Sequence, residues 1–348
     1  MNISYFLGAN SRSGFYSLYD SFPPGEDSFL HIIKGGPGNG KSRFMRRIGA
    51  AAESRGLDVE YVLCSGDPDS LDGVYIPALR TAWCDGTAPH VTEPRIFAVT
   101  SDYVNLGSFC RLPLSAQDSR HIALLNREYK ALYERAYKYL SAAAEIRDGE
   151  ERWEMNPELS LQLTRRLGRI LDATPSTVSG SPTALRRLFT AISCKGRLYL
   201  GESISKLCGR IFSLPDGIAP SFMALAAAEA DSRGLSALLV PEALDPSRLS
   251  ALLLPGCSLA FVPESWELPG KQPLDLEGLE LPEPVTLPEQ YGSALSRAIL
   301  LLSQAKSLHD QLEAVYKPYM DFKALDAFTR AHIQANVEMP MEAESAKP

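Results

Sequence analysis

The sequence lacks the apolar run of about 18 residues that a membrane-spanning helix requires, and its start lacks the basic and then apolar build of a signal peptide. Its six cysteines are scattered without a C-x-x-C pair, which argues against a zinc site and against a small disulfide scaffold. Basic residues are not in excess either, because the 348 residues carry a net charge of −7. We therefore expect a globular cytoplasmic protein with reduced thiols, and neither nucleic acid nor a membrane as its partner.

The chain repeats itself. Residues 53–77 align without gaps on residues 231–255 at an offset of 178, and nine of the 25 positions are identical. Average residue usage would give roughly two identities. Residues 8–21 align on 190–203, and residues 139–151 align on 301–313, in the same order along the chain. This pattern predicts two structural copies, residues 1–180 and 181–348, which form an intramolecular pseudo-dimer with residues 172–183 as the joint.

Strand-like and helix-like segments alternate in the first copy. Apolar runs of strand type occur at 28–34, 58–64, 81–85 and 95–101, and residues 41–56 have helical apolar spacing that ends on a glycine. The alternation predicts a parallel α/β sheet covered by helices. Residues 117–151 predict a long helix outside the sheet, packed with a second helix over 157–172. Its tyrosines at positions 129, 133 and 137 are expected to be packing residues.

A glycine-rich segment follows the first of these strands. Gly35, Gly36, Pro37, Gly38, Asn39, Gly40, Lys41 and Ser42 fit the G-x-x-x-x-G-K-[ST] pattern of the phosphate-binding P-loop. Glycines let several backbone N–H groups converge on a phosphate, and the N-terminus of the following helix adds positive partial charge. Lys41 would reach the phosphate oxygens, and the Ser42 hydroxyl would coordinate Mg²⁺. The strand–loop–helix context therefore predicts a nucleotide site with ATP and Mg²⁺ as ligands, against the alternative of a glycine-rich turn.

Such a loop needs an acidic partner on the metal side, usually at the end of a neighbouring strand. Asp85 ends the run at 81–85. We therefore predict Lys41 and Asp85 as catalytic residues, and Ser42 and Asp85 as magnesium ligands. The alternative is an aspartate that only caps the turn before Gly86.

The second copy has lost this set of residues. At the offset of 178, Lys41 aligns on Ala219, Ser42 on Pro220 and Asp85 on Pro263. We expect the second copy to keep the fold without the nucleotide site. Its remaining role would be to pack against the first copy, to regulate it, or to dock a protein partner.

Other polar residues are weaker candidates. Gly86 stands where many ATPases have a water-activating glutamate, and Glu93 could serve instead. Asp67 recurs as Asp245 and so favours a structural role, whereas Asp69 and Asp72 stay candidates for substrate or magnesium-water contact. His90 could contact a γ-phosphate or be an ordinary loop histidine. The spacing of His309, Asp310 and Glu313 favours a salt-bridged helix face over a metal cluster. Candidates for a phosphoryl-stabilising arginine are Arg12, Arg80 and Arg127.

The segments GGPGNGKS, DPDSLDGVYIP, DGTAPH and DYVNLG resemble an uncharacterised family of bacterial tandem P-loop proteins from Gram-positive spore formers. Its members are described as ATPase-like or nucleotide-kinase-like. The resemblance covers nearly the whole chain and implies two P-loop NTPase-like domains with ATP bound by residues 35–42. It extends less surely to Asp85 and His90. Relatives often keep a P-loop in both halves, so Ala219 and Pro220 in this chain argue against a two-site mechanism.

Three functions fit the sequence. The first is a slow ATPase in which the ATP state changes the arrangement of the two halves or their helical extensions. The second is a kinase that transfers the γ-phosphate to a small acceptor near Asp69, Asp72 and His90. The third is a nucleotide-sensing module without enzymatic activity, whose second copy or helical extensions dock a protein.

Overall fold

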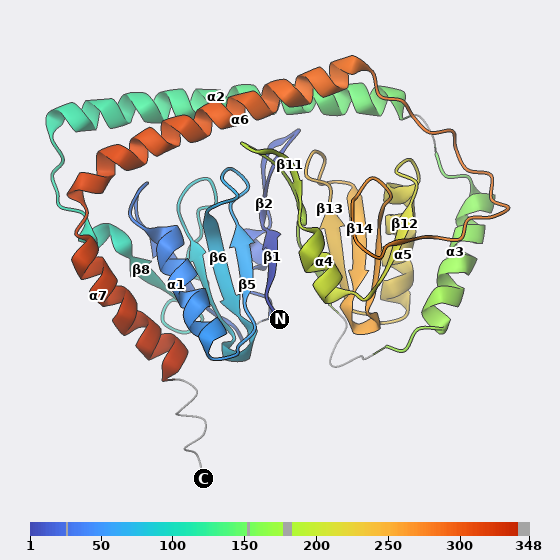
Figure 1. Cartoon of the computed structure of the whole chain (residues 1–348), viewed down its shortest axis with the longest axis horizontal. Helices are drawn as coiled ribbons and strands as arrows, with labels where there is room; N and C mark the ends of the chain where they lie inside the picture. The colour runs from blue at the N-terminus through green and yellow to red at the C-terminus, as the bar shows by residue number, and fades with distance from the viewer. Residues whose placement is uncertain (26, 152–153, 177–182, 340–348) are drawn as a thin grey trace, which may run out of the picture.

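The computed structural model describes residues 1–25, 27–151, 154–176 and 183–339. Two six-stranded mixed sheets lie side by side, one in each half of the chain, and a pair of long helices runs across one end of both sheets (Figure 1). The protein is therefore a mixed α/β structure. The expected joint falls largely on residues 177–182, which lie outside the described residues.

The two sheets have the same strand order. The first sheet is ordered β1 (Ile3–Phe6), β5 (Glu60–Leu63), β6 (Leu71–Ile76), β7 (Thr81–Asp85), β4 (Phe29–Lys34) and β8 (Ser101–Asn105). The second is ordered β9 (Ala184–Arg186), β13 (Ala237–Pro241), β14 (Leu249–Leu254), β15 (Leu259–Pro263), β12 (Arg210–Leu214) and β16 (Gln272–Pro273). In each sheet one strand, β6 or β14, runs antiparallel to both of its neighbours.

The expectation of a purely parallel sheet was wrong because β6 was missed. The chain turns back directly after β5: the Cys64 amide donates to the Ser70 carbonyl and the Ser70 amide donates to the Asp67 carbonyl. A turn this short joins antiparallel strands, since parallel strands need a long crossover. All six residues of β6 are buried, so the strand lacks the alternation that marks a half-exposed strand. The expected strand at 95–101 was also wrong, because β8 begins only at Ser101.

The offset found in the sequence also relates elements of the structure. Strands β6 and β14, strands β7 and β15, and helices α1 (Lys41–Ser54) and α5 (Ala219–Ser232) are each 178 residues apart. The residues before β7 and β15, Arg80 and Ser258, both adopt left-handed backbone, with φ of 48° and 51°. Phe6 and Leu188, equivalent at the offset of 182, pair with each other antiparallel through two backbone hydrogen bonds. An antiparallel pair of equivalent residues relates the two halves by a local twofold axis.

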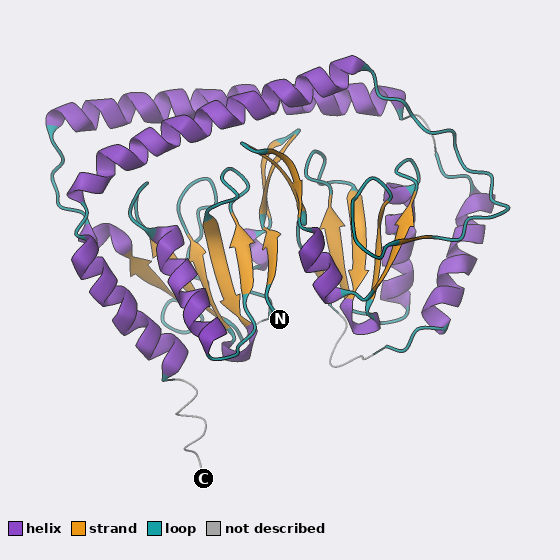
Figure 2. Ribbon diagram, viewed as in Figure 1, coloured by secondary structure: helices purple, strands orange, loops and turns teal. Residues whose placement is uncertain are grey.

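The long helices pair with each other. Helix α2 (Ala116–Glu150) begins at Ser115, whose hydroxyl accepts the Asp118 amide, and its 35 residues span about 52 Å. It packs along α6 (Glu289–Tyr316), which runs in the opposite direction (Figures 1 and 2). The remaining helices are α3 (Pro157–Asp172), α4 (Gly201–Leu207) and α7 (Phe322–Ile333), with short turns η1 (Tyr19–Ser21), η2 (Pro77–Leu79), η3 (Leu106–Phe109), η4 (Pro255–Cys257), η5 (Lys317–Tyr319) and η6 (Gln334–Glu338).

Helices α3 and α7 are exchanged between the halves. The expected packing of residues 157–172 on the long helix was wrong, because α3 packs on α5 beside the second sheet. Conversely, α7 belongs to the second half and packs on α1 beside the first sheet, with Phe328 stacked on Phe44 and Arg47 paired to Asp326 at 2.9 Å. Figure 1 shows α7 and α3 on the outer sides of the two sheets. Each sheet is thus covered by a helix from the other half.

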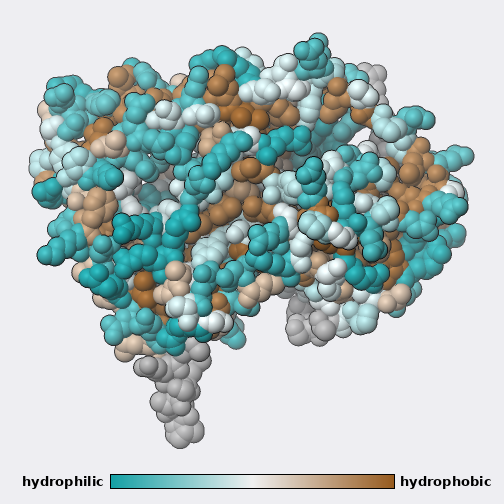
Figure 3. Space-filling view, viewed as in Figure 1, coloured by the Kyte–Doolittle hydropathy of each residue, from teal (hydrophilic) through white to brown (hydrophobic). Residues whose placement is uncertain are grey.

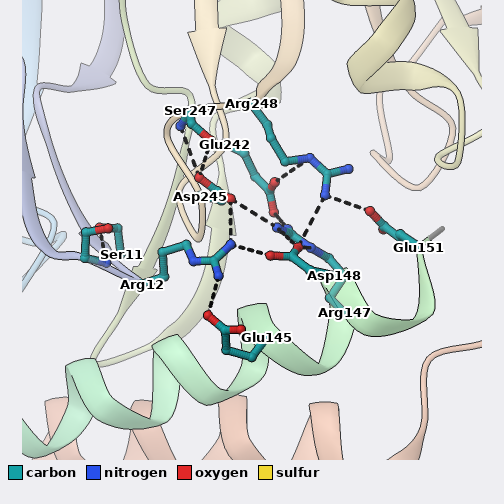
Figure 4. Close-up of polar contacts among 11 residues, drawn as sticks. Ser11, Arg12, Glu145, Arg147, Asp148, Glu151, Glu242, Asp245, Ser247 and Arg248 are labelled. Carbon is teal, nitrogen blue, oxygen red and sulfur yellow. Dashed lines mark hydrogen bonds and ion pairs between the residues drawn. The ribbon is translucent and has the colours of Figure 1, made fainter. Parts of the chain in front are cut away.

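Two hairpins also reach across between the halves. They are β2 (Gly8–Ser11) with β3 (Gly14–Ser17), and β10 (Thr190–Ser193) with β11 (Gly196–Tyr199), and β2 contacts β10. In the turn of the first hairpin, Arg12 pairs with Glu145 of α2 at 2.7 Å and with Asp245 of the second half at 3.0 Å (Figure 4). In the turn of the second hairpin, Lys195 pairs with Asp69 of the first half. A continuous apolar core, which includes Phe6 and Leu188, runs through both halves.

The surface mixes hydrophobic and hydrophilic side chains. On the face shown in Figure 3, hydrophobic side chains occur in small groups among hydrophilic ones. Throughout the described part of the chain, we find no helix that is both long and apolar enough to cross a membrane.

Candidate functional site

The glycine-rich loop Gly35–Ser42 lies at the carboxyl end of β4 and leads into α1. Gly38 and Gly40 have φ of +70° and +79°, in the left-handed region that favours glycine. Gly40 is the residue before the first turn of α1, and no side chain caps this helix. The amide groups of the first turn therefore remain available to an anion.

Lys41 connects the loop to the neighbouring strand. Its ammonium donates to the carbonyl oxygens of Gly35 at 2.7 Å and Gly36 at 3.0 Å. The same nitrogen lies 3.6 Å from a carboxylate oxygen of Asp85. Strands β4 and β7 are parallel neighbours, with Ile33 opposite Asp85, so Asp85 stands beside the start of the loop. The structure thus brings together Lys41 and Asp85, which the sequence analysis had paired.

Ser42 and Asp85 both accept hydrogen bonds from backbone amides. The Ser42 hydroxyl accepts the Leu71 amide at 2.9 Å, which ties the start of α1 to β6. One oxygen of Asp85 accepts the amide and the hydroxyl of Thr87, at 2.9 and 2.6 Å. Asp85 therefore does cap the turn that follows β7, although its partner is Thr87 and not Gly86, the residue named in the alternative. Its other oxygen faces Lys41, so capping leaves that oxygen directed to the loop.

The second half of the chain covers the loop, which the sequence analysis did not foresee. A Cβ atom added to Gly38 would lie 3.0 Å from the Glu313 carbonyl oxygen at the end of α6. One added to Gly40 would lie 3.2 Å from Leu325 of α7. The side-chain amide of Asn39 donates a hydrogen bond to the Met320 sulfur at 3.0 Å. These partners are nearly 300 residues away along the chain, and no local sequence signal could have identified them.

Asp72 and His90 lie with Asp85 at the end of the sheet where β7 finishes and β6 starts. Asp72 precedes Gly73, which pairs with Cys84 across strands β6 and β7, so its carboxylate lies next to that of Asp85. His90 follows in the loop after β7, and its Nε2 is 3.9 Å from Asp72. The three residues are only 7%, 8% and 7% exposed. Recognising residues 71–76 as a hairpin partner of β5 would have placed Asp72 here from the sequence.

Burial shapes the electrostatics of this group. It raises the pKa of the Asp72 carboxyl above its usual value; the nearby His90 opposes the shift, and the carboxylate of Asp85 adds to it. The Tyr19 hydroxyl donates to Asp72 at 3.0 Å, and burial raises the pKa of Tyr19 as well. The group is therefore a compact, poorly hydrated cluster of acids with one imidazole.

Three other acidic candidates lie outside this cluster. Glu93 is exposed and pairs with Lys34 at 3.1 Å, so it is not directed at Lys41 or Asp85. Asp67 accepts the Ser70 hydroxyl at 3.0 Å and pairs with Lys306 of α6, in agreement with the structural role expected for it. Asp69 is exposed and pairs with Lys195 across the two halves.

The remaining candidates pair with other residues or, in the case of Arg127, are exposed. His309 pairs with Glu313 and Lys306 with Asp310 along α6, in agreement with the expected salt-bridged face. Arg12 belongs to the network between the halves, Arg80 pairs with Asp27 at the surface, and Arg127 is exposed on α2. The tyrosines at 129, 133 and 137 form a row of ring contacts along α2, in agreement with packing.

The equivalent place in the second half is a cavity. Ala219, Pro220 and Pro263 line an opening of about 500 Å³ together with Trp266 and Tyr291. At the aligned positions, Ala219 and Pro220 provide neither an ammonium like that of Lys41 nor a hydroxyl like that of Ser42, and Pro263 provides no carboxylate like that of Asp85. The cations that line this cavity, Arg147, Arg197 and Arg248, come from other positions. Arg147 and Glu242, which pair with each other, also line this cavity.

Comparison with known proteins gives no relative: no family model, no curated protein and no solved structure matches this chain.

Proposed function

We propose that the protein is an ATP-binding P-loop NTPase with one functional site, which hydrolyses ATP slowly and uses the ATP state as a conformational switch. The observation that supports this proposal is the contact between Lys41 and Asp85, which joins a glycine-rich loop to the end of the adjacent parallel strand. Ligand sites of open α/β sheets lie at the carboxyl ends of their strands, as this pair does.

The residues present fit Mg²⁺ and a nucleotide. Loop amides and the uncapped start of α1 suit the phosphates, and Lys41 would exchange the carbonyls of Gly35 and Gly36 for phosphate oxygens. Ser42 and Asp85 would hold the metal ion. When bound, Mg²⁺ supplies charge neutralisation and orientation of the phosphates.

Slow hydrolysis follows from the surroundings of Asp85. Rapid hydrolysis requires a residue that orients the attacking water. The next residue is Gly86, and Glu93 is exposed and paired with Lys34. We therefore expect turnover well below the range of 1–10³ s⁻¹ typical of enzymes.

The proposed switch uses the elements that cover the loop. The end of α6 lies against Gly38 of the loop. Helix α7 packs on α1, the helix that follows the loop. Helix α6 continues along α2 to the second half. A phosphate in the loop would alter the contact between Gly38 and Glu313. Helix α6 would transmit that change to the second sheet.

The test is binding of Mg-ATP and release of ADP by the whole chain. We expect saturable ATP binding and slow ADP release by the wild type, with both lost in Lys41→Ala and kept in Lys130→Ala, which removes an exposed lysine of α2. Binding that is equal in all three proteins would contradict the proposal. Binding that requires Lys41 without any turnover would leave a nucleotide sensor.

A kinase is the second candidate, because Tyr19, which contacts Asp72 and His90 of the acidic cluster, also lines a further cavity. It measures about 440 Å³ and is lined by Tyr19, Phe22, Leu30, Thr92 and Ile96 among others. The Tyr19 ring stacks on the His90 ring, with 4.5 Å between the ring centroids. An acceptor in this cavity would contact Tyr19, the residue that connects the cavity to the acidic cluster. ADP release that rises many-fold with one member of a panel of nucleosides and small metabolites would favour a kinase over a switch.

A further inference from the structure

Three side chains of types that can bind a metal ion converge at the end of the first sheet where β7 finishes and β6 starts. Asp72, Asp85 and His90 each offer one atom, and all three atoms lie within 4.8 Å of one another. The residues come from the start of β6, the end of β7 and the loop that follows β7. Two carboxylate oxygens and an imidazole nitrogen at this separation are a suitable donor set for one cation.

The histidine is buried without a hydrogen-bond partner. Among the described residues, neither ring nitrogen of His90 has a hydrogen-bonding partner, although the side chain is more than nine-tenths buried. Leaving such a buried polar group unsatisfied destabilises the folded protein. The His90 ring is held in place by stacking on the Tyr19 ring. The Nε2 atom of His90 lies 3.9 Å from the Asp72 carboxylate, which is beyond hydrogen-bond distance. A cation between them would satisfy the nitrogen.

The two carboxylates are held in place by further groups. The Tyr19 hydroxyl donates to one oxygen of Asp72, and Thr87 donates twice to one oxygen of Asp85. Such contacts orient metal ligands in proteins. Burial and the neighbouring carboxylate of Asp85 raise the pKa of Asp72, and a cation would relieve this repulsion.

We propose that Asp72, Asp85 and His90 bind a divalent transition-metal ion of the Mn²⁺ type directly. Mg²⁺ prefers oxygen donors, whereas an imidazole nitrogen favours first-row transition metals. The site shares Asp85 with the proposed nucleotide site but does not depend on nucleotide. In the second half, Ser250 and Pro263 stand at the positions of Asp72 and Asp85, so the offset of 178 gives no second copy of this site.

The experiment is a titration of the nucleotide-free full chain with Mn²⁺, in which the EPR signal of free Mn²⁺ reports binding. We expect one saturable site, weakened at least tenfold in His90→Gln and in Asp72→Asn. Matched controls are His121→Gln and Asp231→Asn, which change an exposed histidine and an exposed aspartate and should bind as the wild type does. In the wild type, electron spin-echo modulation should show a ¹⁴N coupling, which tests the imidazole ligand without any substitution.

Two results would overturn the proposal: equal Mn²⁺ affinity in all variants without a ¹⁴N coupling, or Mn²⁺ binding only after ATP is added. An excess of Mg²⁺ should displace the ion from His90→Gln more readily than from the wild type. ATP binding is measured separately on the same proteins. Mn²⁺ binding without ATP binding would reject the proposed function alone, and ATP binding without this Mn²⁺ site would reject the metal site alone.

Discussion

Gly38 lies where the glycine-rich loop touches the second half of the chain, and its contact with Glu313 can be tested by one methyl group. Gly38→Ala would place a Cβ atom 3.0 Å from a backbone oxygen, in a residue whose φ is already +70°. Gly56 is a matched control, with φ of +76° and open space around it. We expect Gly56→Ala to lower the free energy of unfolding by about 1 kcal/mol and Gly38→Ala by roughly 1 kcal/mol more.

Urea unfolding of both variants measures this difference. The conformational strain is nearly the same at the two positions, so the additional loss at Gly38 reports the contact with α6. Equal losses would mean that α6 yields without cost and would remove the physical basis of the proposed switch.

Helix α7 contains a histidine that makes its docking sensitive to acid. His332 accepts the indole N–H of Trp83 at 2.8 Å, and burial, with His31 nearby, lowers its pKa to about 4, although Asp102 opposes the shift. Asp102 itself pairs with His31 at 2.7 Å. Between about pH 6.5 and pH 4 the unfolded chain binds a proton at this position and the folded chain does not. Stability therefore falls as the pH falls.

The expected loss is about 2 kcal/mol between pH 7 and pH 5. His332→Gln keeps a hydrogen-bond acceptor for Trp83 but does not titrate, so its stability should depend less on pH by this amount. His121→Gln, at an exposed position of α2, should keep the pH dependence of the wild type. Measurements of unfolding free energy at several pH values decide this. Parallel curves for the wild type and His332→Gln would contradict it.

At the level of elements, local patterns predicted what local forces determine. The long helix and the helix at 157–172 were visible from unbroken apolar spacing, and the structure has them as α2 and α3. Strand β6 was missed because burial on both faces removes alternation. The sheets that α3 and α7 cover were not predictable. An amphipathic pattern shows that a helix has a buried face, but it does not show which half of the chain that face packs against. Lys41 and Asp85 were found because a motif and a strand end specify them, whereas the position of Asp72 depended on β6.

The exchanged helices predict how the whole molecule behaves when its chain is cut. A protease site introduced within residues 177–182 would divide the chain into two fragments. We expect the cut protein to elute as one particle of unchanged size under native conditions, because α2 packs along α6 and each sheet is covered by a helix from the other fragment. Size-exclusion chromatography, with denaturing electrophoresis to confirm the cut, measures this. Two separate fragments in the absence of denaturant would show that the linker holds the halves together.

Phe6 and Leu188 pair with each other from corresponding positions of the repeat. Two copies of a single-repeat ancestor would form the same bridge across a twofold axis, and each would lend its last helix to the other. Duplication and fusion of such a gene needs no new interface. In a homodimer, a substitution changes both copies at once, whereas in the fused chain it changes only one. One copy can therefore lose its lysine, serine and aspartate while the other keeps them. The glycine-rich loop still contacts the altered copy, because α6 and α7 of that copy lie over it, and selection would preserve the fold there after these side chains had been replaced.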